Sequence, residues 1–377
     1  MKLNYTATCL FGIEGFLGEE IEAMGYKRID NMDGRITFEG DENTAAEASV
    51  NLRFAERLYL NLGSFEALTF TELFDGAKSI PWEEIIGRDD EFPVTGHSIK
   101  SKLFSVPDCQ RIIKKAVSVR LGEKYGIERL PETGKRYRIE FFLFKDKVSL
   151  MIDLSGTPLH KRGYRPETVE APIRETLAAA MVKISRPRED VLLWDPFCGS
   201  GTIAIEAAMQ MKNIAPGMKR SFAAEEFPIF PTESWKNARE KAQAAIKTDC
   251  AFEAYATDIE PKCVEIAEAA AKRAGVDDML NIFNMDALDI DTLGRRGTIV
   301  TNPPYGERLL TVDEANDLYR AMGQAFARLD RWQIYVITQS EEFPKLYGRR
   351  ADKIRKLYNG MIPCYYYQFF KQPKPTV

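Results

Sequence analysis

Four consecutive residues, Asn302, Pro303, Pro304 and Tyr305, follow an apolar stretch that ends at Thr301. The amide oxygen of Asn302 and the fixed backbone carbonyl of Pro303 can accept both hydrogens of an amino group, and so orient its lone pair toward a methyl group carried on sulfur. The prolines hold the loop rigid, and the tyrosine ring offers a stacking face for a base taken out of its helix. The pattern predicts methylation of an exocyclic amino group on a nucleic-acid base; the alternative is an ordinary proline-rich turn.

A second segment, residues 195–202, lies between an apolar stretch and a helical pattern. Glycines let a ligand approach the backbone closely, and the carboxyl end of a strand is where open α/β sheets bind cofactors. Ala204 replaces the third glycine of a dinucleotide-binding loop, which favours S-adenosylmethionine over NAD and disfavours an oxidoreductase. The alternative is a tight turn without a ligand. The expected cofactor contacts in this loop are Asp195, Pro196, Phe197, Cys198, Gly199, Ser200, Gly201 and Thr202.

Two acidic residues further along the chain are expected to hold the rest of the cofactor. Asp258 ends the stretch AYATD and is expected to accept hydrogen bonds from the ribose hydroxyls, and the adjacent Ile259 is expected to contact the cofactor as well. Asp286, followed by Ala287, is expected to accept from the adenine amino group. Each aspartate has an alternative role as the cap of a helix or turn. Asn302 is expected to border the cofactor as well as the target amine.

The elements that must position these residues begin near residue 187, where apolar strand patterns start to alternate with helical ones. The segments are VLLWDP, TIAIEAAMQ, AYATDI, CVEIAEAAAKRAG, TIVTNPP, EANDLYRAMGQAFARL and QIYVIT. They predict a parallel, doubly wound α/β sheet covered on both faces, with the motifs at one crevice. Two smaller α+β units precede it. The predicted boundaries are 1–62 and 63–155 for these units, 156–186 for a basic connector, and 187–377 for the α/β domain.

The chain has 377 residues, of which 45% are hydrophobic and 29% charged, and its formal net charge is -4. The length indicates two or three domains, and the composition is typical of a globular protein. So small a charge does not indicate nucleic-acid binding, and any such surface must be a local patch. The six cysteines form no C-x-x-C pair, so we expect no metal site, and Cys198 is expected to pack rather than to act as a nucleophile. No stretch is long enough for a membrane helix, and we expect a cytoplasmic protein.

The whole chain resembles the THUMP-domain class I methyltransferases, which make N2-methylguanosine in ribosomal or transfer RNA. The segments that carry the resemblance are DPFCGSGT, NPPYGER, LSGTPLHKRGYR, APIRETLAAA, KSKLFSVPDCQRIIKKAV and the insertion NIAPGMKRSFAAEEFP. The resemblance implies a ferredoxin-like domain at 1–62, an RNA-binding THUMP domain at 63–155 and a Rossmann-like methyltransferase domain after the connector. It also implies S-adenosylmethionine as cofactor and guanine N2 of an RNA as target.

The resemblance further implies two groups of RNA contacts. One lies on and before a basic helix expected from Asp108 to Leu121, where the alternative is a solvated helix face. The other lies in the connector, where an interdomain salt-bridge network or a wall of the cofactor pocket is the alternative. The candidates are Lys100, Lys102, Arg111, Lys114, Lys115, Lys161, Arg162 and Arg165.

Two other functions compete with this interpretation. The Asn-Pro-Pro-Tyr chemistry also suits a DNA adenine-N6 methyltransferase, although the RNA-binding architecture argues against it. A catalytically idle RNA-binding or assembly protein is the second, and the intact Asn302 and Asp195 argue against that. We expect a monomer or weak homodimer.

Overall fold

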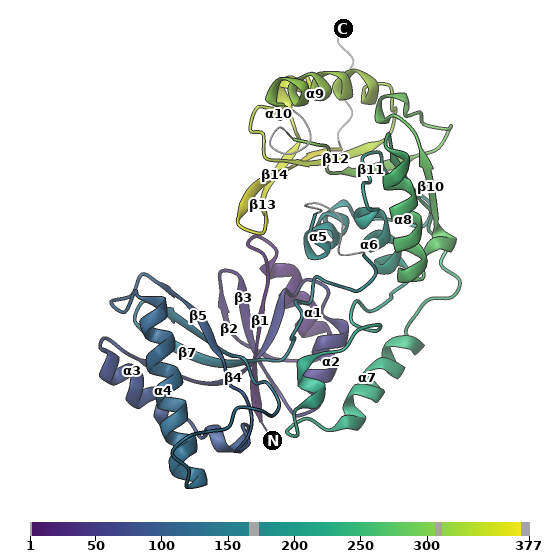
Figure 1. The fold of residues 1–377 in the computed structure, drawn as a ribbon. Helices are drawn as coiled ribbons and strands as arrows, with labels where there is room; N and C mark the ends of the chain where they lie inside the picture. The colour runs from purple at the N-terminus through teal and green to yellow at the C-terminus, as the bar shows by residue number, and fades with distance from the viewer. Residues whose placement is uncertain (1, 166–172, 306–310, 371–377) are drawn as a thin grey trace.

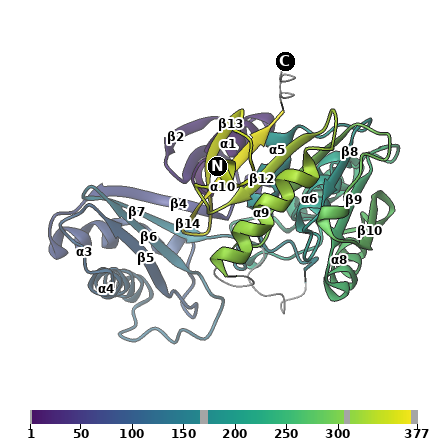
Figure 2. The ribbon, with the colours of Figure 1, turned by 90° about the horizontal axis from the view of Figure 1, so that it is seen from above.

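Two seven-stranded sheets form the framework of the protein in a computed structural model, which describes residues 2–165, 173–305 and 311–370 (Figure 1). The first sheet belongs to the amino-terminal part of the chain and the second to the carboxyl-terminal part. Seen from above, the two sheets lie side by side, with helix α5 (Glu175–Ser185) between them (Figure 2). Within the described residues, no helix is both long and apolar enough to cross a lipid bilayer.

The first sheet is continuous across both α+β units. Its strands, in spatial order, are β2 (Arg28–Met32), β3 (Arg35–Gly40), β1 (Leu3–Thr8), β4 (Arg57–Glu66), β7 (Lys147–Asp153), β6 (Ile139–Phe144) and β5 (Val94–Ile99). Only β5 and β6 run parallel; the other neighbours are antiparallel. Strand β4 pairs with β1 of one unit and β7 of the other, so the boundary expected between residues 62 and 63 falls inside one strand.

The helices of the amino-terminal part are α1 (Glu14–Ala23), α2 (Thr44–Asn51), α3 (Phe70–Ser79) and α4 (Val106–Tyr125), with a 3-10 turn at Trp82–Glu84. Helix α4 is the expected basic helix, and it is longer than predicted at both ends. A proline in its first turn needs no intrahelical donor, and Gly126 ends it in the left-handed conformation with φ of 65°. The helix therefore presents its amino-terminal end to the loop that follows β5.

The second sheet confirms the predicted Rossmann-like α/β fold. Its spatial order is β10 (Leu280–Asn284), β9 (Ala254–Asp258), β8 (Leu192–Asp195), β11 (Gly297–Thr301), β12 (Gln333–Thr338), β14 (Ile362–Phe369) and β13 (Lys353–Asn359). The first five strands are parallel, and the carboxyl-terminal hairpin β13–β14 adds two antiparallel ones. The chain order reverses between β8 and β11, which is the switch point where open α/β sheets bind ligands.

Helices cover both faces of this sheet because alternate residues of its strands point to opposite sides. Leu193 of β8 packs in the core shared with the amino-terminal part, whereas Leu192 and Trp194 pack on the opposite face. The helices are α5 (Glu175–Ser185), α6 (Thr202–Met211), α7 (Thr232–Ala244), α8 (Pro261–Ala274), α9 (Val312–Phe326) and α10 (Phe343–Leu346). Helices α5, α6 and α8 pack in the core shared with the amino-terminal part, and α9 packs in the core on the opposite face of the sheet.

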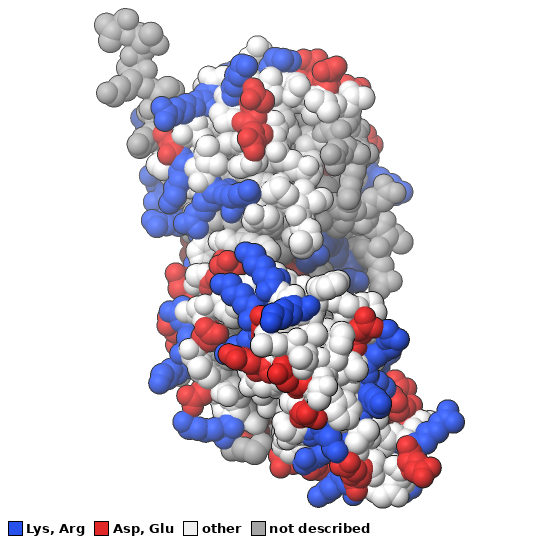
Figure 3. All heavy atoms as spheres, turned by 90° about the vertical axis from the view of Figure 1, so that its left-hand side faces the viewer, with Lys and Arg blue, Asp and Glu red and all other residues white. Residues whose placement is uncertain are grey.

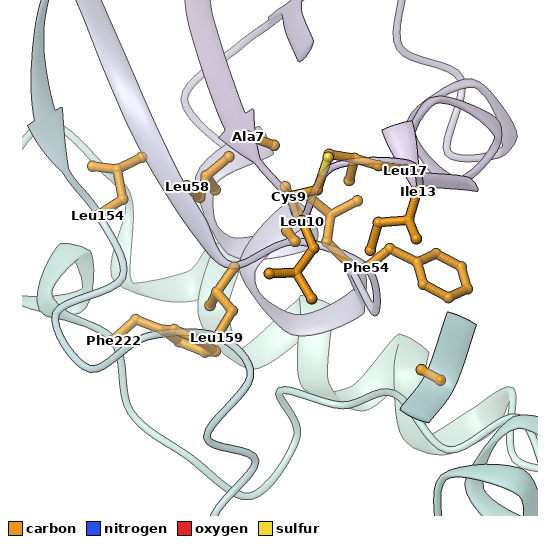
Figure 4. Packing of buried hydrophobic residues seen from close by; sticks show 14 of the residues in the cluster. Ala7, Cys9, Leu10, Ile13, Leu17, Phe54, Leu58, Leu154, Leu159 and Phe222 are labelled. Carbon is orange, nitrogen blue, oxygen red and sulfur yellow. The ribbon is translucent and has the colours of Figure 1, made fainter. Parts of the chain in front are cut away.

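One hydrophobic core runs from the amino-terminal part into the α/β domain (Figure 4). Leu10 and Phe54 from the first unit, Leu154 at the end of β7, Leu159 of the connector and Phe222 of the insertion all belong to it. Because these buried side chains come from both α+β units, the connector and the α/β domain, the two halves of the chain are packed as one body rather than joined by a free linker.

Candidate active site

A buried hydrogen bond joins the two strands that flank the switch point. Asp195 is the last residue of β8 and Thr301 the last of β11, and these strands are parallel neighbours. The Thr301 hydroxyl donates to Oδ1 of Asp195 at 2.7 Å, and the backbone N–H of Phe197 donates to the same oxygen at 3.3 Å. This hydrogen bond therefore joins the two predicted motifs at their bases, since one motif begins at Asp195 and the other directly follows Thr301.

The Asp195 carboxyl is only 1% exposed. Burial raises its pKa to about 7, and the nearby Asp258 carboxylate also raises it, while the hydrogen bonds from Thr301 and Phe197 act in the opposite direction. An acidic group whose ionised form is so poorly solvated costs stability, and such groups are typical of functional sites.

The loop after β8 is shaped by two glycines in the left-handed conformation, with φ of 52° at Gly199 and 75° at Gly201. A methyl group added to Gly201 would lie 3.0 Å from Cβ of Ala267, so this glycine permits close packing against α8. A methyl group on Gly199 would meet no atom within 4 Å. The open side at Gly199 leaves room for a ligand to approach the backbone, and its use by the cofactor remains a prediction.

Asp258 at the end of β9 is tied to this loop. Its Oδ2 accepts a hydrogen bond from the Gly199 N–H at 2.8 Å, and its Oδ1 accepts from the Glu260 N–H at 3.0 Å. The Cys198 N–H also donates to the carbonyl of the preceding Thr257 at 2.9 Å. A half-buried carboxylate at a strand tip beside a glycine loop has the chemistry needed to bind ribose hydroxyls. Ile259, the other residue expected here, is exposed.

Asp286 lies beyond the end of β10, the strand next to β9. Its Oδ1 accepts a hydrogen bond from the Leu288 N–H at 2.9 Å and so caps a short 3-10 turn. The capping role that the sequence left open is therefore present. Ala287, the first residue of that turn, is buried. The assignment of Asp286 to the adenine and of Ala287 to the cofactor site remains a prediction.

The Asn-Pro-Pro-Tyr segment follows β11 directly, with Asn302, Pro304 and Tyr305 half-buried and Pro303 buried. The phenol of Tyr319 from α9 lies 3.5 Å from the Pro304 carbonyl and 2.8 Å from the Thr338 hydroxyl at the end of β12. The neighbouring helix and strand thus support the segment from behind.

No sequence motif marked Tyr319, Thr338 or Thr301. Each lies in an ordinary amphipathic helix or apolar strand, and its role follows only from the spatial arrangement. Of the NPPYGER segment, Gly306, Glu307 and Arg308 lie outside the described residues.

The connector corrects one predicted RNA contact. Arg162 is 3% exposed, and its Nε lies 3.4 Å from Glu206 of α6 while its other nitrogens donate to the carbonyls of Leu159 and Arg53. Such a buried guanidinium has no free face for a phosphate, so the prediction that it contacts RNA is wrong. It belongs to the interdomain network that the sequence left as an alternative, together with Arg53, which lies 3.4 Å from the other Glu206 oxygen.

Arg165 reaches the cofactor loop instead of the surface. Its guanidinium pairs with Glu175 of α5 at 2.9 Å, donates to the Ile173 carbonyl at 3.0 Å and lies 3.4 Å from the Thr202 hydroxyl. This contact agrees with the alternative that the connector shapes the cofactor pocket. Lys161 is exposed, and residues 166–172 of the predicted junction lie outside the described residues.

The candidate contacts around α4 differ in their surroundings. Lys100, Lys102 and Lys115 are exposed, and Arg111 is exposed while paired with Asp108. The Lys114 ammonium lies 3.6 Å from the Phe92 ring centre and pairs with Glu132. These residues remain predicted RNA contacts. Lys114 is the least available to a phosphate because its ammonium group already interacts with Glu132 and the Phe92 ring.

In the part of the chain that the structure describes, no three histidine, cysteine, aspartate or glutamate side chains are grouped as metal ligands. Burial raises the pKa of the Cys198 thiol well above its usual value, with a smaller contribution from Asp195 and Asp258. The neutral, buried thiol is a packing group and a poor nucleophile.

Three family models match the chain. The model described as the RMKL-like methyltransferase domain covers residues 162–368, the RlmL ferredoxin-like domain covers residues 4–59, and the THUMP domain covers residues 67–153. The first match alone spans more than half of the chain. Together they match the three parts that the resemblance predicted.

Known proteins with similar sequences or structures agree with these matches. YpsC of Bacillus subtilis, named as a candidate RNA methyltransferase, is 43% identical over 99% of this chain and 97% of its own length. The ribosomal RNA large subunit methyltransferase K/L of Psychromonas ingrahamii is 33% identical over 99% of this chain, which spans only 51% of that protein. The crystal structure of SMU.472, a candidate methyltransferase in complex with SAH, has a TM-score of 0.91 and 39% identity, covering 99% of each chain. The chain therefore belongs to the family of RMKL-like methyltransferases that carry a ferredoxin-like and a THUMP domain.

Proposed function

We propose that this protein transfers a methyl group from S-adenosylmethionine to an exocyclic amine of an RNA base, with guanine N2 in ribosomal or transfer RNA as the target. The observation that carries the proposal is the position of Asn302 at the end of β11, directly beside the cofactor loop that begins at Asp195 at the end of β8. An amine held by Asn302 would face a ligand held by that loop across the switch point.

S-adenosylmethionine supplies the methyl group as an electrophile on a sulfonium centre. The open backbone at Gly199 fits its amino-acid part, and the Asp258 carboxylate fits its ribose. Asp286 is the proposed partner of its adenine amino group. The solved relative with bound SAH supports this choice of cofactor.

The chain's own contribution to catalysis is orientation. The Asn302 side-chain oxygen and the Pro303 carbonyl accept the two amine hydrogens, which localises the nitrogen lone pair that is otherwise delocalised into the ring. The Tyr305 ring stacks on the extruded base. Tyr319 and Thr338 brace this segment, so the acceptors are fixed before the substrate arrives.

RNA as the substrate is supported by the THUMP match and by the names of two relatives, an RNA methyltransferase and a ribosomal RNA methyltransferase. Guanine N2 rests on the family resemblance, because Asn-Pro-Pro-Tyr suits adenine amines as well. The continuous sheet and shared core hold the THUMP unit at a fixed place relative to the crevice. Because the two parts are fixed relative to each other, RNA bound at the THUMP unit would determine which base reaches the crevice.

The test is methyl transfer from labelled S-adenosylmethionine to separate pools of unmodified ribosomal RNA, transfer RNA and DNA, followed by identification of the labelled nucleoside by mass spectrometry. We expect N2-methylguanosine in one RNA pool, lost with Asn302→Ala and retained with Asn281→Ala, an exposed asparagine on β10. Label in DNA adenine would replace the proposal with its rival. Cofactor binding without any methylated nucleoside would indicate a catalytically idle protein.

A further inference from the structure

A largely buried carboxylate joins the amino-terminal sheet to the connector and to the helix that follows it. Glu56 lies directly before β4, where its N–H donates to the Thr8 carbonyl at 2.7 Å and its own carbonyl accepts from the Leu159 N–H at 2.8 Å. Figure 3 shows the α/β domain above and the amino-terminal part below, meeting at a waist. Because its backbone is held on both sides, Glu56 has a fixed position between these two parts of the chain.

The Glu56 side chain, which is only 13% exposed, binds groups from the connector and from the start of α5. Its Oε2 accepts from Nη1 of Arg174 at 2.5 Å and lies 3.1 Å from Nδ1 of His160, and its Oε1 accepts from the Thr176 hydroxyl. Burial alone would raise the pKa of Glu56, but the interactions with these neighbours outweigh burial and lower the pKa to about 2. The carboxylate is therefore ionised at neutral pH, and hydrogen bonds to an ionised group are stronger than neutral ones.

These contacts fix the first turn of α5. The residue before the helix, Arg174, forms no side-chain capping hydrogen bond, so the usual means of fixing a helix start is not used here. Arg174 and Thr176 lie on either side of Glu175 in the sequence, and both are bound by Glu56. Glu56 therefore holds the turn in which Glu175 lies, from outside the helix.

Glu175 carries the connection on to the cofactor loop. Its carboxyl group is 2% exposed and pairs with the Arg165 guanidinium at 2.9 Å. That guanidinium lies 3.4 Å from the Thr202 hydroxyl, which in turn lies 3.1 Å from the Ser200 hydroxyl. Ser200 and Thr202 both belong to the loop that follows β8. A continuous series of polar contacts thus runs from the amino-terminal sheet to this loop.

We propose that Glu56 is a positioning residue of the cofactor site, acting through the first turn of α5 and Arg165 on the loop that follows β8. The ferredoxin-like unit would then take part in cofactor binding, although no residue of this unit was predicted to do so. The proposal rests on the proposed function, since this loop is where S-adenosylmethionine is proposed to bind. Without the Glu56 carboxylate, the turn and Arg165 are free to shift, and a site held less precisely binds its ligand less tightly.

The test is calorimetric measurement of S-adenosylmethionine binding to the full-length protein. Glu56→Gln keeps the size of the side chain but removes its charge, and it should raise the dissociation constant about 3- to 30-fold, the range for residues that act on a site through intervening contacts. The matched control is Asp153→Asn, another buried carboxylate of the same sheet, which pairs with Arg57. It should leave cofactor affinity unchanged, even where it lowers the melting temperature as much as Glu56→Gln does.

A double substitution separates positioning from a general loss of structure. In Arg165→Ala the last contact with the loop is already broken, so adding Glu56→Gln should change the dissociation constant by less than about twofold. A general weakening of the fold would instead show its full effect in both backgrounds. Thr176→Val removes one hydrogen bond to Glu56 with little change of shape, and it should also weaken cofactor binding, which provides the test if Glu56→Gln folds poorly.

An unchanged cofactor affinity in Glu56→Gln and Thr176→Val would overturn the proposal. So would an equal loss of affinity in Asp153→Asn, or a full additional loss when Glu56→Gln is combined with Arg165→Ala. The measurement uses no RNA, so its failure is distinct from that of the proposed function. A wild-type protein that binds S-adenosylmethionine but methylates no RNA would refute the proposed function alone, whereas one that does not bind the cofactor would refute both.

Discussion

The buried carboxyl of Asp195 makes the stability of the protein depend on pH in a way that one substitution should abolish. Asp195→Asn keeps the shape of the side chain, and its amide oxygen can still accept from Thr301 and Phe197, but it removes the ionisable group. In the folded protein the pKa of Asp195 is raised from the ordinary 3.8 to about 7. The native state thus binds this proton more tightly than the unfolded chain does, and the stability from that proton is fully present below about pH 4 and lost as pH rises through about 7.

The size of the effect follows from the shift. At about 1.4 kcal/mol per pH unit, the rise in pKa corresponds to about 4 kcal/mol in total, of which about 2–3 kcal/mol falls between about pH 5 and pH 8. The free energy of unfolding of Asp195→Asn, relative to wild type, should therefore increase by that amount between these two pH values. Other titrating groups are common to both proteins and cancel in the difference.

The assay is urea unfolding of both proteins at the two pH values, followed by tryptophan fluorescence, to which the adjacent Trp194 contributes. Asp289→Asn, at an exposed carboxylate in the same domain, is the control and should show no change in the difference. If wild type and Asp195→Asn keep a constant difference at both pH values, Asp195 titrates in the native protein as it does in the unfolded chain. The argument from burial would then be refuted.

Three further substitutions test the site and its attachment. Asp258→Ala should weaken S-adenosylmethionine binding about 10- to 100-fold in calorimetry, which is the contribution expected of hydrogen bonds to a charged group. The control is Glu265→Ala at an exposed residue of α8. If Asp258→Ala binds the cofactor as tightly as this control, Asp258 does not belong to the site. Glu206→Gln removes the carboxylate that two buried guanidinium groups share, although Glu20 and Glu175 remain near them, and should cost about 3 kcal/mol in urea unfolding. A cost below about 1 kcal/mol would show that the network carries no structural role. Gly201→Ala places an alanine in the left-handed conformation against α8. It should lower the free energy of unfolding by about 1–2 kcal/mol and weaken cofactor binding. Wild-type stability and wild-type cofactor affinity would contradict the packing argument.

The sequence predicted that the two motifs meet at one crevice of the sheet, because their signals are local. The strand, glycine loop and helix around Gly199, and the strand and proline loop around Asn302, each lie within a dozen residues, and the parallel sheet brings them together by topology alone. The expected α/β fold follows from the same apolar runs, since strands such as β8 and β11 are buried on both faces.

The parts that were missed depend on partners far away in the chain. Arg162 lies in a basic loop that suggests exposure, yet Glu206 and Arg53 bury it from 44 and 109 residues away. The hairpin β13–β14 was not predicted, because β13 is a polar edge strand with little apolar pattern. Local pattern does not encode such long-range pairs.

The central claim, that Asn302 orients an amine for methyl transfer beside the cofactor loop, is tested most directly by single-turnover rates. The measurement compares wild type and Asn302→Ala on the RNA pool that accepts methyl groups, with S-adenosylmethionine affinity determined in parallel. Loss of one preorganised hydrogen-bonding group should lower the transfer rate roughly 100- to 1,000-fold while cofactor affinity changes far less. An Asn302→Ala protein that methylates the same RNA at the wild-type rate would contradict the account.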